Sequence, residues 1–324
     1  MELFKDYKLL VEQRIASLNF DKKPLQLYQP IAYALSGGGK RLRPVLTLAA
    51  CDLFGGNVQE AAEAAIGIEI FHNFTLLHDD IMDESLLRRG KETVHKKWNT
   101  NVAILSGDTM FALAYRFIQT AKSGQLCHIL ETFTQAAIEV CEGQQFDMDF
   151  ENRDDVSIPE YINMIRLKTA VLLGASLKIG ALCANADSQQ AESMYDFGVN
   201  VGIAFQLKDD YLDAFGNAEK FGKKIGGDIV ANKKTWLLLK SLELADSPDK
   251  LRLLQLFQQK NGDANSKVSE ALRLYEKYKI NNLAMVEMER YFRNSIEIID
   301  RIEAPTNKKT ALIDYARWLF EREH

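Results

Sequence analysis

The distribution of proline constrains the fold of this chain more than any other feature of its sequence. The 324 residues include only six prolines: Pro24, Pro30, Pro44, Pro159, Pro248 and Pro305. None lies between Pro44 and Pro159 or between Pro159 and Pro248. Because proline is excluded from helix interiors, and because apolar residues recur here at three- and four-residue spacing, the sequence predicts helices throughout. Runs of alternating β-branched residues are hard to find, so we predict an all-α protein.

Short glycine-rich or polar segments mark the expected breaks between helices. They fall at 36–40, 54–57, 88–93, 152–160 and 221–228. The last has three glycines among lysines and is typical of a loop. No low-complexity linker or short-period repeat divides the chain. We therefore predict a single domain over residues 1–324, built as a helical bundle around a deep central cavity.

The bulk composition excludes several classes of protein. The chain is 47% hydrophobic and 26% charged, and its net charge of −5 argues against a general nucleic-acid-binding protein. Its four cysteines are scattered without a CxxC pair, which indicates neither a zinc site nor a disulfide framework. The N-terminal segment lacks the apolar core of a signal peptide, and no apolar run is long enough to span a membrane. We expect a cytoplasmic protein.

One acidic pattern, Asp-Asp-x-x-Asp, occurs twice, within the runs HNFTLLHDDIMD and AFQLKDDYLD. In a helix, Asp79 and Asp83 project from one face, and so do Asp209 and Asp213. Like charges at this spacing destabilise a helix by about 0.2–0.5 kcal/mol, so a bound cation is expected to offset the repulsion. Carboxylates select Mg²⁺ over softer metals, and Mg²⁺ usually binds one or two carboxylates together with phosphate oxygens. The two motifs therefore indicate diphosphate chemistry.

A single carboxylate triplet on a helix is more often a solvated face than a metal site. Two triplets with the same spacing, both embedded in apolar sequence, make the solvated face the less favoured interpretation. We expect the two acidic helices to line opposite faces of one cavity in the bundle.

Two basic clusters lie beside predicted loops. The segment Lys40-Arg41-Leu42-Arg43-Pro44 follows three glycines. If Pro44 stands in the first turn of a helix, Lys40 and Arg43 lie near its positive end, where anions bind well. The segment lacks the GxxxxGK[ST] spacing of a P-loop, which excludes that interpretation. The second cluster, Arg88-Arg89, follows the first acidic motif, and its guanidinium groups match phosphate in shape and charge.

A third cluster, formed by Lys223, Lys224 and Lys233, surrounds the glycines of 221–228. One basic cluster alone is more often a solubilising patch than a binding site. Three clusters, two of them close in sequence to an acidic motif, favour the binding of phosphate groups.

Five motifs together resemble those of trans-isoprenyl diphosphate synthases, the polyprenyl synthetase family. In order they are GGGKRLRP, LLHDDIMDESLLRRG, Lys168-Thr169, FQLKDDYLD and GKKIGGDIVANKKTW. The match extends from about residue 30 to 240. It implies an all-α bundle around a deep cavity, commonly a homodimer, that joins isopentenyl diphosphate head to tail to an allylic diphosphate.

The resemblance also assigns residues to the allylic diphosphate. Asp79 and Asp83 bind two Mg²⁺ and Asp209 binds a third, with support from Asp80, Asp210 and Asp213. Further donors to the same diphosphate are Arg88, Lys168, Lys233 and Lys224. The spacing to Asp228 favours Lys224 over Lys223 as the ligand. Thr169 and Gln206 resemble the residues whose oxygens stabilise the allylic cation.

Isopentenyl diphosphate is expected to be held by Lys40, Arg43, His72 and Arg89 in the family pattern. Without the resemblance, His72 is as readily a structural hydrogen-bonding residue of an apolar helix. His78, next to Asp79, matches no family role. No carboxylate base is required, because the released diphosphate takes the proton that the condensation sets free.

Phe74 and Thr75 lie five and four residues before Asp79, about one helical turn deeper, or about 5.4 Å. By resemblance, a large aromatic residue at the fifth position floors the pocket and limits products to about C15–C20. The motif also lacks the two-residue insertion of many bacterial farnesyl synthases. Both features favour geranylgeranyl diphosphate (C20), with farnesyl (C15) and longer products as alternatives. Phe74 also suits ordinary core packing, and Met110, Phe111 and Tyr115 are further candidates for the floor.

Two other functions were weighed against a synthase. Class I terpene cyclases share the first acidic motif, but their second metal motif usually mixes Asn, Ser and Glu, and they lack the GGKRLRP segment. A non-catalytic subunit of a synthase is expected to have degenerate acidic motifs, whereas both motifs here are intact. The intact pair favours the synthase.

Overall fold

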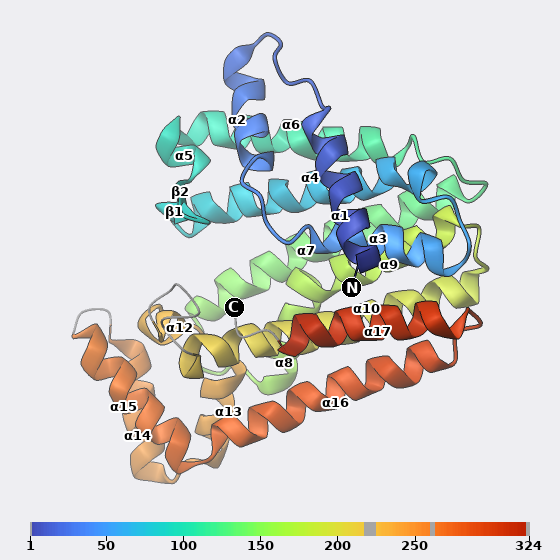
Figure 1. Ribbon diagram of the computed structural model, residues 1–324. Coiled ribbons are helices and arrows are strands. Elements are labelled where there is room, and N and C mark those ends of the chain that lie inside the picture. Colours follow the sequence, from blue (N-terminus) through green and yellow to red (C-terminus); the bar gives the residue numbers. More distant parts are fainter. Residues whose placement is uncertain (1, 217–224, 260–262, 322–324) are drawn as a thin grey trace. The chain divides into compact units, whose positions relative to one another are not determined.

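The structure is a computed structural model that describes residues 2–216, 225–259 and 263–321 (Figure 1). Over these residues the chain is helical, apart from one short two-stranded hairpin. The prediction of an all-α fold is therefore confirmed. Lys223 and Lys224 lie outside the described residues. Within the described ranges, no helix is both long enough and apolar enough to cross a membrane.

The chain forms two compact units. Unit 1 comprises residues 1–134, 175–194 and 303–309, and unit 2 comprises residues 135–174, 195–302 and 310–324. Four helices contribute residues to both: α7 (Leu126–Glu151), α9 (Val171–Cys183), α10 (Ser188–Phe215) and α17 (Thr306–Glu321). The single domain over residues 1–324 stays a prediction.

Unit 1 is built around α4 (Val58–Met82), which packs against α3 (Leu42–Leu53) and α6 (Thr100–Ile118) (Figure 1). Both α3 and α4 are apolar around most of their circumference, as expected of buried helices. The outer elements are α1 (Glu2–Ala16), α2 (Leu25–Leu35), α5 (Val94–Lys97) and the antiparallel hairpin of β1 (Leu87–Arg88) and β2 (Lys91–Glu92). The hairpin follows the first acidic motif directly.

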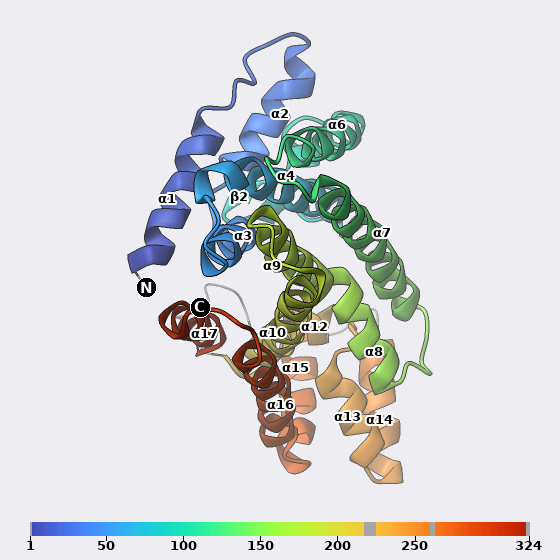
Figure 2. The same cartoon turned by 90° about the vertical axis from the view of Figure 1, so that its right-hand side faces the viewer.

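Unit 2 continues from α7 into α8 (Ile158–Ile165), a π-helix η1 (Arg166–Ala170) and α9. After α10 come α12 (Gly227–Val230), α13 (Trp236–Leu244), α14 (Ser247–Gln258), α15 (Ala264–Lys277) and α16 (Ile280–Asp300). Helices α13 to α16 lie side by side (Figure 2). Their apolar faces, with Leu238, Leu253 and Tyr275 fully buried, form a core with α8 and α10.

Most prolines stand where helices begin. Pro44 lies in the first turn of α3, and Pro159 and Pro248 lie in the first turns of α8 and α14. A proline there loses no hydrogen bond, since the first N–H groups of a helix have no partner within it. Pro30 is the exception, because it lies inside α2. The breaks expected at 36–40, 54–57 and 152–160 separate helices as predicted.

Candidate active site

The first acidic motif forms the C-terminal end of α4. Asp79 and Asp80 lie in its last turn, and Asp83 caps it, with the Asp83 N–H donating to the Asp79 carbonyl at 2.8 Å. Carboxylates are unfavourable at this end of a helix, because the carbonyl groups there carry partial negative charge. The position therefore strengthens the expectation that Asp79 and Asp83 bind cations.

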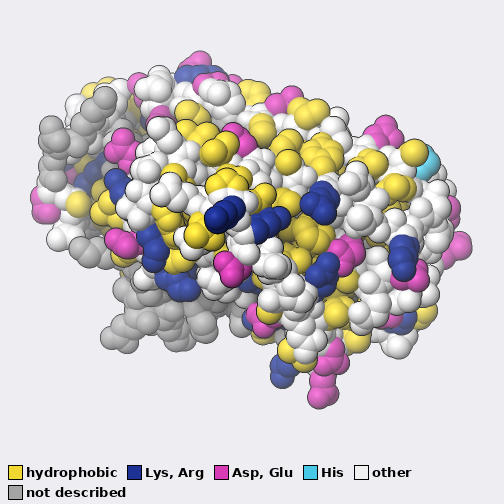
Figure 3. Space-filling view, turned by 90° about the horizontal axis from the view of Figure 1, so that it is seen from above, with side chains coloured by type: hydrophobic (Ala, Val, Ile, Leu, Met, Phe, Trp, Pro, Cys, Tyr) yellow, Lys and Arg dark blue, Asp and Glu magenta, His cyan; other side chains and the backbone are white. Residues whose placement is uncertain are grey.

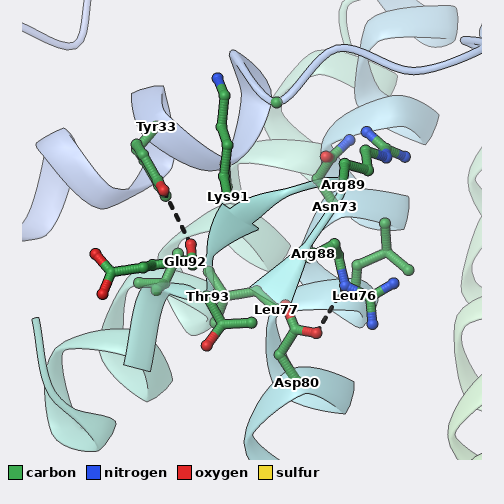
Figure 4. Close-up of a pocket in the computed structure, with 13 residues that line it drawn as sticks. Tyr33, Asn73, Leu76, Leu77, Asp80, Arg88, Arg89, Lys91, Glu92 and Thr93 are labelled. Carbon is green, nitrogen blue, oxygen red and sulfur yellow. Dashed lines mark hydrogen bonds and ion pairs between the residues drawn. The ribbon is translucent and has the colours of Figure 1, made fainter. Parts of the chain in front are cut away.

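Asp80, the middle residue of the motif, is buried against the hairpin. Its side chain is 7% exposed, and Arg88 Nε on β1 donates to Asp80 Oδ1 at 2.7 Å (Figure 4). Burial raises the pKa of Asp80, and the charge of Arg88 opposes that rise. Asp80 thus holds Arg88 beside the acidic motif. Both residues line a pocket with Arg89, Asn73 and Tyr33 (Figure 4).

The backbone of the glycine loop at 36–40 binds the side chain of Arg89. An Arg89 Nη donates to the Gly38 carbonyl oxygen, and a Cβ at Gly39 would lie 2.8 Å from Arg89 Cζ. Gly38 and Gly39 have φ angles of 68° and 122°, which favour glycine over other residues. The glycines therefore allow the close approach that places Arg89 next to the Lys40-Arg43 segment.

Arg43 and His72 form the core of this basic cluster. Arg43 Nη1 lies 3.1 Å from His72 Nε2. Burial, together with the charges of Arg43 and Arg89, holds the pKa of His72 well below its ordinary value. His72 is therefore neutral, and because guanidinium only donates, Nε2 accepts this hydrogen bond. Burial lowers the pKa of Arg43 to about 10, which leaves it cationic at neutral pH.

A buried ion pair beneath the cluster was not predicted from the sequence. Arg41 Nη1 donates to Glu69 Oε1 at 2.7 Å, and Arg41 Nη2 donates to the Leu35 carbonyl at 2.6 Å. Asn73 Nδ2 also donates to Glu69 Oε1, at 3.1 Å. Glu69 thus forms its ion pair with Arg41, and its charge acts at longer range on Arg43 and Arg89. A lone Glu within an apolar helical run was the available signal for this partner.

The second acidic motif lies near the C-terminal end of α10. Asp210, its middle residue, is buried and accepts from Tyr161 Oη of α8. Gln206 Nε2, one turn earlier on α10, donates to Asp210 Oδ1 at 3.2 Å. Burial, with the nearby charge of Asp228, raises the pKa of Asp210 well above its ordinary value. This contact of Tyr161 with Asp210 was not predicted from the sequence.

Asp213 positions the turn that follows the undescribed residues 217–224. Asp213 Oδ2 accepts from the Asp228 N–H at 2.9 Å, and the Asp213 carbonyl accepts from the Gly226 N–H at 2.7 Å. Lys233 Nζ lies 3.8 Å from Asp228 Oδ1. The third acidic residue of this motif therefore organises the loop that carries Asp228 and Lys233.

Lys168 and Thr169 both lie in the π-helix η1. Lys168 Nζ donates to Asp147 on α7, and Thr169 Oγ1 donates to Gln206 Oε1 at 3.1 Å. One pocket of unit 2 contains most of the residues predicted there. Its lining includes Lys168, Thr169, Gln206, Asp210, Lys233, and the unpredicted Asp147, Tyr161 and Asp228.

Phe74 lies within a cluster of aromatic rings between α4 and α6. Its ring centroid is 5.3 Å from that of Phe111 and 5.5 Å from that of Phe71. Tyr115 extends the cluster, since its ring lies 5.3 Å from that of Phe111. His78 packs edge-on against Phe74, with centroids 4.7 Å apart. Phe111 therefore packs directly against Phe74, the predicted floor, and Tyr115 packs against Phe111. The role of Phe74 in product length stays a prediction.

The carboxylates present fit Mg²⁺ that binds together with a phosphate ligand. No group of three or more His, Cys, Asp or Glu side chains in the described ranges is arranged as a metal cage. Mg²⁺ does not require one, because it takes one or two carboxylates and completes its shell with water and phosphate oxygens. Asp79 and Asp209 are half-buried and Asp83 is exposed, while the middle residue of each motif is buried.

These features define an all-α protein in which carboxylates and basic side chains cluster at the ends of buried helices. The chain belongs to the polyprenyl synthetase family, whose family model, described as Polyprenyl synthetase, matches residues 24–275. It is 35% identical to a short chain isoprenyl diphosphate synthase of Methanothermobacter thermautotrophicus, over 100% of this chain and 99% of that protein. It is 38% identical to a geranylgeranyl diphosphate synthase of Sulfolobus acidocaldarius, over 87% of this chain and 86% of that protein.

Solved structures agree with this family. A crystal structure of a geranylgeranyl pyrophosphate synthase superposes with a TM-score of 0.94 at 43% identity, covering 99% of both chains. The predicted resemblance to trans-isoprenyl diphosphate synthases is confirmed.

Proposed function

We propose that this protein is a prenyltransferase that condenses isopentenyl diphosphate head to tail with allylic diphosphates, giving a short-chain trans-prenyl diphosphate with C20 as the expected main product. Family membership and the geranylgeranyl synthases among its relatives support the activity. One structural observation carries most weight: Lys168, Thr169 and Gln206 line a single pocket with the buried Asp210. That pocket combines a cation for diphosphate with neutral oxygens for a carbocation.

The allylic substrate must lose diphosphate before the new bond forms. Breaking its C–O bond builds negative charge on the leaving group, and Lys168, Lys233 and Arg88 supply donors to that charge. Asp79 and Asp83 would hold two Mg²⁺ and Asp209 a third, with Asp80, Asp210 and Asp213 in support. Mg²⁺ would neutralise charge on the departing diphosphate.

Thr169 and Gln206 would stabilise the allylic cation with their oxygen atoms. Because the Thr169 hydroxyl donates a hydrogen bond to Gln206 Oε1, the lone pairs of its oxygen are available to the pocket. Asp210 accepts from Gln206 Nε2 and so fixes which end of the amide meets Thr169. The amide donors are thereby kept away from the positive centre, where they would oppose its formation.

Isopentenyl diphosphate would be held by Lys40, Arg43, His72 and Arg89. Arg43 and Arg89 would meet the diphosphate directly, because Glu69 forms its ion pair with Arg41. Neutral His72 adds no like charge to the cluster, and it orients Arg43 through the hydrogen bond at Nε2. The released diphosphate is the base that we expect to take the proton lost from the new product.

The product length would be set by Phe74, with the small Thr75 beside it. Phe74 packs against the rings of Phe71 and Phe111, and Tyr115 packs in turn against Phe111. C15 remains the second candidate product. The loop ligand would be Lys224; because Lys223 is adjacent, a Lys223→Ala variant is the matched control, and Lys224→Ala is expected to raise KM for the allylic substrate alone.

We further propose a cytoplasmic homodimer. No disulfide joins the cysteines in the described ranges, which suits a reducing compartment. The face of unit 1 in Figure 3 presents hydrophobic side chains among Lys and Arg. Ile104 and Leu105 on α6 are 42% and 58% exposed, and Leu25 on α2 is 43% exposed. Such apolar side chains favour contact with a second copy of the chain; sedimentation equilibrium tests this stoichiometry.

The decisive experiment is product analysis. Purified protein is incubated with labelled isopentenyl diphosphate, Mg²⁺ and C5, C10 or C15 allylic diphosphate, and the dephosphorylated products are sized by chromatography. C20 alcohols that disappear with EDTA are the expected result. Products of C30 or longer would keep the activity and remove Phe74 as floor. Cyclised hydrocarbons would indicate a terpene cyclase, and no turnover with any primer would indicate a non-catalytic subunit.

A further inference from the structure

The short π-helix η1 is the most unusual backbone element of unit 2. In it the Val171 N–H donates to the Arg166 carbonyl, five residues earlier, where an α-helix would use the carbonyl four residues earlier. A π-helix is rare because its geometry is unfavourable, and it persists where surrounding structure stabilises it. This one carries Lys168 and Thr169, so the shift in register changes where both side chains point.

Helix α7 contacts the π-helix through a glycine. A Cβ at Gly143 would lie 2.6 Å from Lys168 Cα and 2.7 Å from the Leu167 carbonyl carbon, closer than any real Cβ contact. Only a glycine admits this approach of two backbones. One turn further along α7, Asp147 accepts from Lys168 Nζ. A single face of α7 therefore holds Lys168 at both its backbone and its ammonium group.

Helix α10 contacts the other side of the π-helix in the same way. A Cβ at Gly202 would lie 2.6 Å from Ala170 Cα and 2.7 Å from Ala170 Cβ. One turn further along α10, Gln206 accepts from Thr169 Oγ1. Each neighbouring helix thus packs a glycine against the π-helix backbone. Four residues later, the same helix accepts a hydrogen bond from a side chain of the π-helix.

Tyr161 joins the same assembly from the preceding helix. Its hydroxyl donates to Asp210, which accepts also from Gln206. Gln206 also accepts from Thr169. Helix α10 is therefore hydrogen-bonded both to α8, which precedes the π-helix, and to the π-helix itself. Ser157 and Glu160 cap the beginning of α8 with a reciprocal capping box, which anchors that end.

We infer that Gly143 and Gly202 are positioning residues for this reaction: their closeness to η1 holds Lys168 at the allylic diphosphate and Thr169 at the carbocation. The inference deepens the proposed function and rests on it. A side chain at either position would push η1 away or shift it toward an α-helical register. Lys168 and Thr169 would then move out of reaction geometry, where a shift of about 1 Å costs about 10²-fold in rate.

The two glycines are expected to affect different kinetic constants. Gly202→Ala displaces Ala170 next to Thr169, so kcat should fall about 10²-fold while KM for isopentenyl diphosphate is unchanged. Gly143→Ala displaces Lys168, so KM for the allylic diphosphate should rise as well. Steady-state assays normalised to folded enzyme, measured by circular dichroism, give both constants.

Gly180→Ala is the matched control. Gly180 on α9 is as tightly packed, since a Cβ there would contact the Thr47 carbonyl oxygen and lie 2.8 Å from Ala50 Cβ. Those neighbours belong to α3 and include no proposed site residue. The control is expected to lower the melting temperature with kcat per folded enzyme unchanged.

A double-mutant cycle separates positioning from general destabilisation. In a Thr169→Ala background, Gly202→Ala should cost far less in kcat than in the parent, because the group that it misplaces is already absent. Multiplicative losses, or parental kinetics in both folded glycine variants, would overturn the inference. If one glycine variant does not fold, the other tests its own side of η1 independently. A parent enzyme without condensation activity would instead refute the proposed function.

Discussion

The two acidic motifs share three aspartates at the same spacing, and their middle aspartates are similarly buried, yet these middle residues have different partners. Asp80 is 5% exposed and Asp210 is 6% exposed. Asp80 meets a cation, Arg88, whereas Asp210 meets the neutral donors Tyr161 and Gln206. The two carboxylates therefore differ in their hydrogen-bond partners, although their exposed fractions are nearly equal.

The partners assign the two middle carboxylates different tasks. Asp80 balances and orients an arginine of the hairpin, which is a proposed donor to diphosphate. Asp210 orients a neutral amide that meets Thr169, a proposed carbocation contact. A motif that recurs in sequence can thus supply charge balance in one place and dipole orientation in another, while Asp79, Asp83 and Asp209 share the proposed role of binding Mg²⁺.

The largest expected effect tests that common role. Asp79→Ala and Asp209→Ala should each lower kcat by about 10²–10³-fold or more, because each removes stabilisation of the departing diphosphate. Steady-state assays over a range of Mg²⁺ concentrations measure both losses. Full activity in either variant at saturating Mg²⁺ would show that the two motifs are not equivalent in their outer positions.

The second prediction concerns the residue five positions before each motif, which differs between α4 and α10. Five residues before the first motif stands Phe74, whereas the same position before Asp209 is occupied by Ala204. Phe74→Ala should shift the main product beyond C20 by opening the ring cluster, measured by chromatography of the prenyl alcohols. An unchanged product from Phe74→Ala would place the floor elsewhere.

The third prediction concerns the middle aspartates and stability. Asp80→Asn leaves Arg88 without its carboxylate, and because Arg88 is partly exposed the loss should be only about 1 kcal/mol of unfolding free energy. Asp210→Asn should instead increase the unfolding free energy near pH 8, because it removes a carboxylate that is costly to ionise when buried. Urea unfolding of both variants beside the parent makes the comparison.

The pH dependence of the Asp210 effect has a definite sign. Because the pKa of Asp210 is raised in the folded protein, its contribution is fully present below the ordinary Asp range and is lost as pH rises through the raised value. The stability difference between Asp210→Asn and the parent should therefore grow from pH 5 to pH 8. If this difference in unfolding free energy did not change with pH, Asp210 would not be buried among neutral hydrogen-bond donors as described.

The helices and the identity of most proposed ligands were predictable from sequence because they depend on local patterns. Proline placement and three- to four-residue apolar spacing act within a few residues, so both acidic runs were expected to be helical, as they are in α4 and α10. The glycines at 36–40 and the paired arginines 88 and 89 also stand in short motifs. Even so, the contact of the Arg89 side chain with the backbone of Gly38 and Gly39 was not predicted from the sequence.

The buried partners depended on tertiary structure alone. Tyr161 reaches Asp210, Asp147 reaches Lys168, and Glu69 reaches Arg41, and each pair is joined by helix packing rather than by spacing. The π-helix is a similar case, because its register depends on contacts with two glycines from other helices.

By itself, the sequence determined that this chain is helical and which carboxylates and cations are suited to diphosphate, since periodicity and charge are local properties. Which aspartate ionises easily, which amide end faces Thr169 and where Lys168 points were decided only by tertiary structure. Those properties follow from desolvation and from hydrogen bonds between distant segments, and both arise only when the helices pack.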